Sequence, residues 1–282
     1  MPGTFSDSWK LTRTSFRLIR EDRSLLVFPV TAGLSILGVL ALLIAGWVWV
    51  AWPLAGGPAG FNGPFVAVAF GMFLAAYFAM VFLSVYCTAA LVGAATLKLS
   101  GQQPTASDGW HVARARLGRL FLWAVITATV GLVIRLAASR VRGLGGMVIG
   151  LVGGATWAVV TYFMIPVLVY ENQGAWSSLK RSAHLFTSTF GRSLVSNLVV
   201  GLLIGAGIVV AVVFGLVGLF EAVGGSVLLG IVLIGVGVAV GVVVALIGAA
   251  AEGILRAALY RYATTGKIDP DLVPSAYTHL RF

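Results

Sequence analysis

The residues from 226 to 251 restrict this chain to one class of protein more sharply than any other feature. The run carries no charge, and nothing in it is more polar than Ser226. A helix crosses the hydrocarbon core of a bilayer with about 20 apolar residues, and this run is longer. Hydrocarbon offers no partner for backbone N–H and C=O groups, so the run must satisfy them internally, as a helix. The stretch therefore predicts a membrane-spanning helix.

Five further apolar stretches meet the same requirement. Hydrophobic residues make up 59% of the chain and charged residues 10%, whereas soluble domains carry about 25% charged residues. The sequence thus predicts an all-α, polytopic membrane helical bundle that occupies residues 1–282 as a single integral membrane domain. The expected membrane helices are 25–52, 65–98, 120–138, 144–170, 194–223 and 226–262, followed by a tail at 263–282.

Three segments outside the spans have the pattern of amphipathic helices that lie in the membrane interface. The segment 6–22 sets its cations on one stripe and its aromatic and aliphatic residues opposite. Trp110–Arg119 and Ala175–Phe190 are the other two. Each carries a tryptophan followed four residues later by a cation. This recurrence fits either a duplicated unit, made of one interfacial helix and one helical hairpin, or the general preference of such helices for Trp and Arg.

The basic faces of these segments predict membrane lipids as partners, through anionic headgroups on the cytoplasmic side. For 6–22, a soluble helix packed on a partner is the alternative. The net charge of +10 would suggest nucleic acid in a soluble protein, but cytoplasmic loops of membrane proteins collect Lys and Arg, so no nucleic-acid partner is expected. The residues expected at lipid headgroups are Trp9, Lys10, Arg13, Arg17, Arg20, Arg114, Trp176, Lys180 and Arg181.

The distribution of cations predicts the orientation of the chain. Of its 19 Lys and Arg residues, three lie on one side of the expected topology and the rest on the other. Because Lys and Arg are enriched in cytoplasmic loops, we expect a protein of the cell membrane with both termini in the cytoplasm. The exceptions are Arg135, Arg140 and Arg142. They fit either recruitment of an anion or anionic lipid at an external hairpin or snorkelling to the outer headgroups.

Glu252 and Arg256 are ionisable residues inside the last expected span, where charge is costly and marks a candidate site. Their spacing of four residues lets the two side chains pair on one face of a helix. One interpretation is a gate or a proton- or ion-coupling site. The other is an internal pair that fixes the cytoplasmic end of the helix, with the arginine snorkelling to the interface.

Small residues recur at a spacing that allows two helices to approach closely. They predict either packing within the bundle or a homo-oligomer. Cys87, the single cysteine, is expected to be a small packing residue. The spaced glycines are Gly146, Gly150 and Gly154, then Gly201 and Gly205, then Gly237 and Gly241.

Two short motifs carry a resemblance to a known family. The first is Ser8-Trp9-Lys10 followed by the run 25–29, and the second is the run 166–171 followed by 179–182. The chain resembles an uncharacterised family of bacterial and archaeal six-span membrane proteins, known as a domain of unknown function. Its central part is also loosely similar to the membrane domain of some glycerophosphodiester phosphodiesterases. The resemblance implies a six-span membrane fold and no assigned activity, and the phosphodiesterase reaction does not carry over because the chain has no hydrolase part.

The sequence shows no pattern typical of catalysis. It contains no HExxH, no Cys/His cluster, no phosphate loop and no GxSxG. We therefore expect no catalytic residue, no metal and no cofactor. The leading hypothesis is a non-enzymatic small transporter, channel or lipid-handling component. The alternative is a membrane scaffold or assembly partner that docks through its basic cytoplasmic helices.

Overall fold

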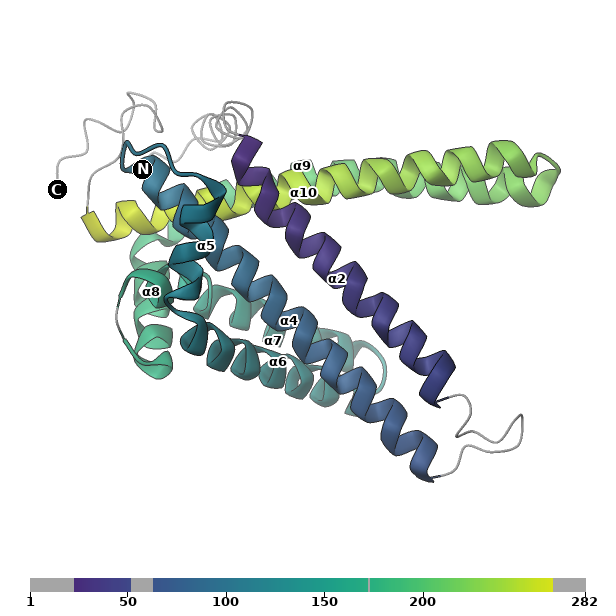
Figure 1. Cartoon of the computed structure of the whole chain (residues 1–282), viewed down its shortest axis with the longest axis horizontal. Helices are drawn as coiled ribbons and strands as arrows, with labels where there is room; N and C mark the ends of the chain where they lie inside the picture. The colour runs from purple at the N-terminus through teal and green to yellow at the C-terminus, as the bar shows by residue number, and fades with distance from the viewer. Residues whose placement is uncertain (1–22, 52–62, 172, 266–282) are drawn as a thin grey trace. The chain divides into compact units, whose positions relative to one another are not determined.

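The computed structural model describes residues 23–51, 63–171 and 173–265 (Figure 1). These residues form helices and turns without a β-strand among them, and six helices are long and apolar enough to cross a membrane. The expected all-α, six-span architecture is thereby confirmed. The expected interfacial helix at 6–22 and most of the tail at 263–282 lie outside the described residues.

The spans follow one another in chain order with short connections. A 3₁₀ turn (η1, Arg23–Leu26) leads into α2 (Val27–Gly46), which ends in a π-helical turn (η2, Trp47–Ala51). Two short helices, α5 and α8, lie between or within the later spans. The remaining helices are α4 (Gly63–Leu99), α5 (Ala106–Arg114), α6 (Leu117–Arg140), α7 (Leu144–Val160), α8 (Met164–Tyr170), α9 (Ala175–Gly224) and α10 (Val227–Thr265).

The helix α9 differs from the expectation of a separate interfacial helix at 175–190 and a span that starts at 194. It runs for 50 residues without interruption, and its described part that is long and apolar enough to cross a membrane is Ile204–Gly224. The intervening residues contain no proline, and a single glycine costs a helix only about 1 kcal/mol. The amphipathic segment and the fifth span are therefore one helix.

The helices group into two compact units, and the first contains Met1–Pro29, Ala94–Ala106 and Leu185–Phe282. In its described part, α9 and α10 run antiparallel as a long hairpin, green to yellow in Figure 1. The connection turns at Gly225, whose φ of 125° is a left-handed conformation that side-chain-bearing residues rarely adopt. Gly225 thus forms the turn between the last two spans.

Burial in the first unit is concentrated toward the C-terminal end of α10. Leu25 and Phe28 are buried, and η1 packs against α10. The half of the hairpin nearest its turn instead exposes large apolar side chains, which is the surface that acyl chains solvate in a membrane. The buried residues of α10 in this region are Ala250, Ala251, Ile254, Leu255, Ala257, Leu259 and Tyr260.

Glycines allow the two helices of this hairpin to approach each other closely. A Cβ built on Gly237 would lie 2.7 Å from the carbonyl oxygen of Ala211, and one on Gly230 would lie 2.6 Å from that of Gly218. Backbone atoms cannot yield as a flexible side chain can. The close approach of α9 and α10 therefore requires glycine at these positions, as expected for packing within the chain. By contrast, a Cβ at Gly205 would meet nothing within 4 Å among the described residues.

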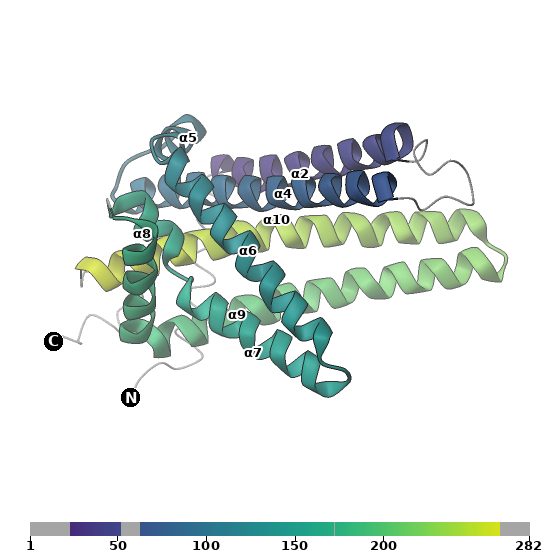
Figure 2. The ribbon, with the colours of Figure 1, turned by 90° about the horizontal axis from the view of Figure 1, so that it is seen from below.

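The second unit contains Val30–Gly93 and Ser107–His184. Its helices α6 and α7 pack together as a hairpin, and α2 lies beside α4 (Figure 2). Trp123 of α6 stacks on Trp157 of α7, with ring centroids 5.7 Å apart and an interplanar angle of 21°. The buried core of the unit follows this contact toward α8, and it includes Leu120, Phe163, Met164, Val167 and Leu168.

The fourth span is interrupted, although its sequence predicts one continuous helix. A turn at 161–163 separates α7 from α8. Pro166 explains the break, because it has no N–H to donate to the carbonyl of Tyr162 and its ring crowds that carbonyl. The backbone there forms a hydrogen bond with a spacing of three residues instead of four. The Met164 N–H donates to the carbonyl of Thr161 at 3.0 Å.

Candidate functional site

The polar groups of the second unit gather around the interrupted end of the fourth span, beginning at the turn itself. The Phe163 N–H loses its helical partner and donates instead to the hydroxyl of Ser182 on α9, at 3.1 Å and away from solvent. Ser178 lies one turn earlier on the same face of α9, and both serines are fully buried. The Ser178 hydroxyl has no hydrogen-bond partner among the described residues.

The end of α8 is held by two long-range hydrogen bonds. The Nε of Arg116 donates to the carbonyl of Val169 at 3.2 Å, which places a cation at the negative end of the helix dipole. The hydroxyl of Tyr170 donates to the carbonyl of Gly93 on α4, also at 3.2 Å. These bonds fix the point at which the chain leaves the span.

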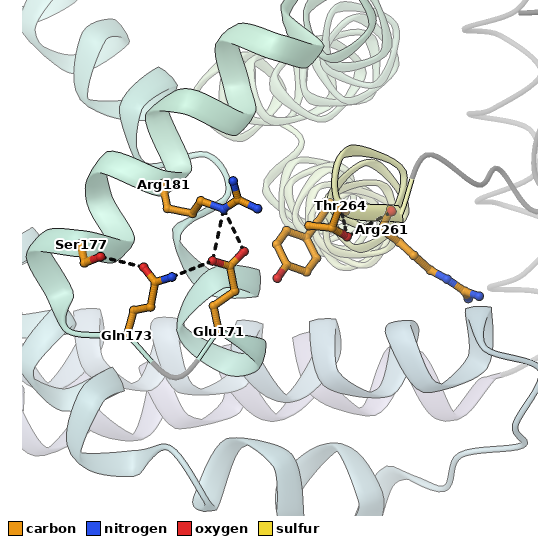
Figure 3. A network of polar contacts seen from close by, with 7 residues as sticks. Glu171, Gln173, Ser177, Arg181, Arg261 and Thr264 are labelled. Atoms are coloured by element: carbon orange, nitrogen blue, oxygen red, sulfur yellow. Dashed lines mark hydrogen bonds and ion pairs between the residues drawn. The ribbon is translucent and has the colours of Figure 1, made fainter. Parts of the chain in front are cut away.

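A polar cluster follows directly, between α8 and α9 (Figure 3). The Nε of Arg181 donates to both carboxylate oxygens of Glu171, each at 3.2 Å. Gln173 donates through its Nε2 to Glu171 at 3.2 Å, and the hydroxyl of Ser177 donates to the Gln173 Oε1 at 2.7 Å. We call these four residues the α8–α9 polar cluster. Figure 3 also draws the end of α10, where the Thr264 hydroxyl donates to the carbonyl of Arg261 at 3.2 Å.

The guanidinium of Arg181 is oriented by this cluster and remains accessible. Its side chain is 38% exposed, whereas that of Glu171 is 18% exposed. Figure 3 shows the two terminal nitrogens of Arg181 pointing away from the carboxylate. The carboxylate therefore fixes one edge of the guanidinium and leaves the other edge facing outward.

Trp176 and Lys180 lie on the same two turns of α9. Trp176 is 70% exposed, and the Nζ of Lys180 lies 5.7 Å from the centroid of its ring, within the range of a cation–π contact. Span four ends at Tyr170, so these side chains follow the end of a membrane helix by a few residues. The structure thus brings together three residues expected at headgroups: Trp176, Lys180 and Arg181.

The segment Trp110–Arg119 differs from the single amphipathic piece expected there. The helix α5 ends at Arg114 and α6 begins at Leu117, so the segment is divided by a turn. Trp110 stacks on Tyr86, with ring centroids 5.4 Å apart, and Arg114 is exposed. The expected headgroup residues Trp9, Lys10, Arg13, Arg17 and Arg20 lie outside the described residues.

The expected pair of Glu252 and Arg256 does form, as an ion pair on α10 in the first unit. Its side chains are 41% and 26% exposed, so the pair is not enclosed. Arg135, Arg140 and Arg142 are exposed at the last turns of α6 and in the turn that follows. Arg140 there complements the negative end of the helix dipole.

Sequence reasoning did not find the serine pair, the role of Arg116 or the ion pair of Glu171 with Arg181. A proline deep in an apolar span was the signal for the break, and the spacing of Ser178 and Ser182 was the signal for its partner. Within the described ranges, no three His, Cys, Asp or Glu side chains gather into a metal-binding group. Arg181 of the α8–α9 polar cluster and the neighbouring Lys180 supply positively charged hydrogen-bond donors.

Comparison with known proteins places the chain in a family. The model of a family of unknown function, DUF6159, matches residues 64–269, which is more than half of the chain. No curated protein and no solved structure matches it. The resemblance to an uncharacterised family is thereby confirmed, and the looser similarity to phosphodiesterase membrane domains stays a prediction. With its six apolar helices, this multi-pass membrane protein belongs to the DUF6159 family of unknown function.

Proposed function

We propose that this protein is a non-enzymatic, lipid-handling component of the cell membrane that binds anionic phospholipids of the cytoplasmic leaflet. The observation that carries the proposal is the exposed group of Trp176, Lys180 and Arg181, placed just past the end of a membrane span. A tryptophan ring is favoured at the depth of the headgroups, and cations on anionic lipid are worth about 1 kcal/mol each.

Depth in the membrane limits what these side chains can meet. The helix α9 starts five residues after the last residue of α8, so its first turns must lie close to the membrane surface that the fourth span reaches. Phosphate groups of the bilayer are the anions at highest concentration at that depth. The two cations therefore face phospholipid whether or not another partner is present.

The orientation belongs to the same proposal, because the headgroup site must face the anionic cytoplasmic leaflet. We expect both termini in the cytoplasm, since nearly all cations then lie inside. Single cysteines placed near each terminus of a Cys87→Ala variant should resist an impermeant thiol reagent in intact cells and react after permeabilisation. Cys87 is the single cysteine of the chain, so its replacement leaves the introduced thiols as the sites of labelling. Labelling of either terminus from outside would contradict the topology and the leaflet assigned to the site.

Lipid binding predicts a difference between headgroups in the purified protein. In detergent micelles, added phosphatidylglycerol should raise the melting temperature more than the same amount of phosphatidylcholine. At a lipid concentration 100 times the dissociation constant, binding stabilises the folded state by about 2.7 kcal/mol, or roughly 5–10 °C for a chain of this size. Thermal unfolding followed by tryptophan fluorescence measures the shift. Equal shifts with both lipids would contradict the proposal.

Transport of a small solute is the second candidate, and the interrupted fourth span favours it. Discontinuous membrane helices expose backbone carbonyls and helix ends, and secondary transporters use them to bind substrates and ions. In this chain the Phe163 N–H freed by the break is already satisfied by Ser182. Lipid handling therefore stands first, and transport or a scaffolding role takes its place if the two lipids stabilise the protein equally.

A further inference from the structure

We propose that Arg181 is the phosphate-binding residue of this site, and that its ligand is a phosphodiester lipid whose headgroup carries no positive charge. The inference rests on the proposed lipid function and deepens it, because it assigns the recognition to one guanidinium and names the chemistry of the headgroup. Glu171 acts through Arg181 as a positioning residue.

The geometry of the guanidinium supplies the first argument. The Nε of Arg181 is engaged by both oxygens of Glu171, and the terminal nitrogens point away from that carboxylate (Figure 3). The outer edge of a guanidinium carries two parallel N–H donors that match two oxygens of one phosphate. At 38% exposure, the side chain is within reach of a lipid at the surface.

The α8–α9 polar cluster supplies the second argument, since it fixes the direction of that edge. Ser177 bonds to Gln173, Gln173 to Glu171, and Glu171 to Arg181, each through a side-chain hydrogen bond. An arginine on a free surface loses rotamer freedom when it binds a ligand. At this site the hydrogen bonds to Glu171 already supply part of that ordering, which distinguishes Arg181 from a solvated surface cation.

Charge complementarity selects the headgroup. Arg181 and Lys180 carry two positive charges and Glu171 carries one negative charge, so the site has a net charge of +1 that suits a phosphodiester of charge −1. Lys180 already lies over the ring of Trp176, where a choline or ethanolamine cation would otherwise be received. Such a cation would also meet the like charge of Lys180. Phosphatidylglycerol fits these conditions, whereas phosphatidylcholine does not.

A pair of matched variants tests the assignment. Arg181→Gln removes the outer edge and should lower the apparent affinity for phosphatidylglycerol about tenfold or more, as expected for the loss of charged hydrogen bonds. Arg114→Gln removes an exposed cation of the same unit that pairs with no carboxylate among the described residues, so it should cost only the general attraction of one cation to the headgroups, about fivefold or less. Both are read from melting temperatures over a titration of phosphatidylglycerol into micelles, with phosphatidylcholine as the reference lipid.

Two further variants separate lipid recognition from folding. Arg181→Lys keeps the charge and loses the two-donor edge, so its affinity should fall between those of the wild type and Arg181→Gln. Glu171→Gln should weaken phosphatidylglycerol binding while the melting temperature in phosphatidylcholine changes by a smaller amount. A variant that merely folds poorly would lose the same number of degrees in both lipids. Bound lipid is counted independently by mass spectrometry of the protein after detergent exchange.

The outcomes distinguish this inference from the proposed function. If wild-type protein prefers phosphatidylglycerol and Arg181→Gln keeps that preference, the assignment of Arg181 is overturned and lipid binding stands. If the wild type shows no preference, both proposals are overturned. If inorganic phosphate at millimolar concentration stabilises the protein as much as the lipid does, the site binds free phosphate and the lipid assignment is overturned.

Discussion

Gly237→Ala is expected to lower the melting temperature of the protein, whereas Gly235→Ala on the same helix should leave it unchanged or raise it. The added Cβ at Gly237 would lie 2.7 Å from the carbonyl oxygen of Ala211 and 3.1 Å from the backbone nitrogen of Gly215. At Gly235 a Cβ meets nothing within 4 Å in the part of the chain that the structure describes. Both substitutions remove the same glycine flexibility from α10, so the difference between them reports the contact with α9.

The size of the effect follows from the atoms involved. Extra methyl groups in a well-packed interior cost about 1–3 kcal/mol, and the cost is at the upper end where the opposing atoms belong to a backbone. In an open helical position, replacing glycine by alanine gains up to about 1 kcal/mol. Thermal unfolding of the two variants in the same detergent measures the difference. Equal melting temperatures would show that α9 and α10 do not pack through their glycines.

The second large effect is expected from Ser182→Ala. This change removes the hydroxyl that accepts the N–H of Phe163 at 3.1 Å and leaves a buried backbone donor without a partner. Such a donor costs about 1–3 kcal/mol. Ser178→Ala provides the control, because both serines are fully buried on one face of α9 and the Ser178 hydroxyl has no partner among the described residues. It should leave the stability unchanged or raise it, because it removes an unpartnered hydroxyl from the interior.

Thermal denaturation of both variants in the same detergent measures the difference in their stability. The two variants lose the same atoms from the same helix, so their helix propensity and the lost volume cancel. If Ser178→Ala costs as much as Ser182→Ala, the bond to the interrupted fourth span contributes nothing measurable. A result of that kind would also show that the Phe163 N–H does not depend on Ser182 as its acceptor.

The spans could be predicted because the membrane imposes one simple requirement on every one of them. The expected helix at 226–262 is observed as Val227–Thr265, and the one at 120–138 as Leu117–Arg140. A charged or glycine-rich flank ends the apolar run in each case, and the observed helix contains nearly the whole run. The pairing of Glu252 with Arg256 could be predicted for a similar reason, because the spacing of four residues along one helix already brings the two side chains together.

Contacts between two separate helices could not be predicted from the sequence in this way. The proline at 166 is visible in the sequence, but its position alone does not reveal that Ser182 supplies the missing acceptor. The contact of Arg181 with Glu171 joins α9 to the residue that follows α8, so it depends on how both helices are placed. The continuity of α9 depends on the absence of any strong helix breaker between an amphipathic segment and an apolar one, and hydrophobic periodicity separates those two segments even when the backbone does not.

The hairpin of α9 and α10 also sets a length scale. The described apolar part of α9, Ile204–Gly224, has 21 residues and rises about 31 Å, so it alone is long enough for the roughly 30 Å of an average hydrocarbon core. Its partner α10, Val227–Thr265, has 39 residues and rises about 58 Å, which exceeds that thickness. A bilayer that does not match the hairpin would have to change its local thickness or let the helices tilt, at a cost of a fraction of a kcal/mol for each ångström of mismatch. The hairpin thereby links the stability of the protein to the thickness of the membrane around it.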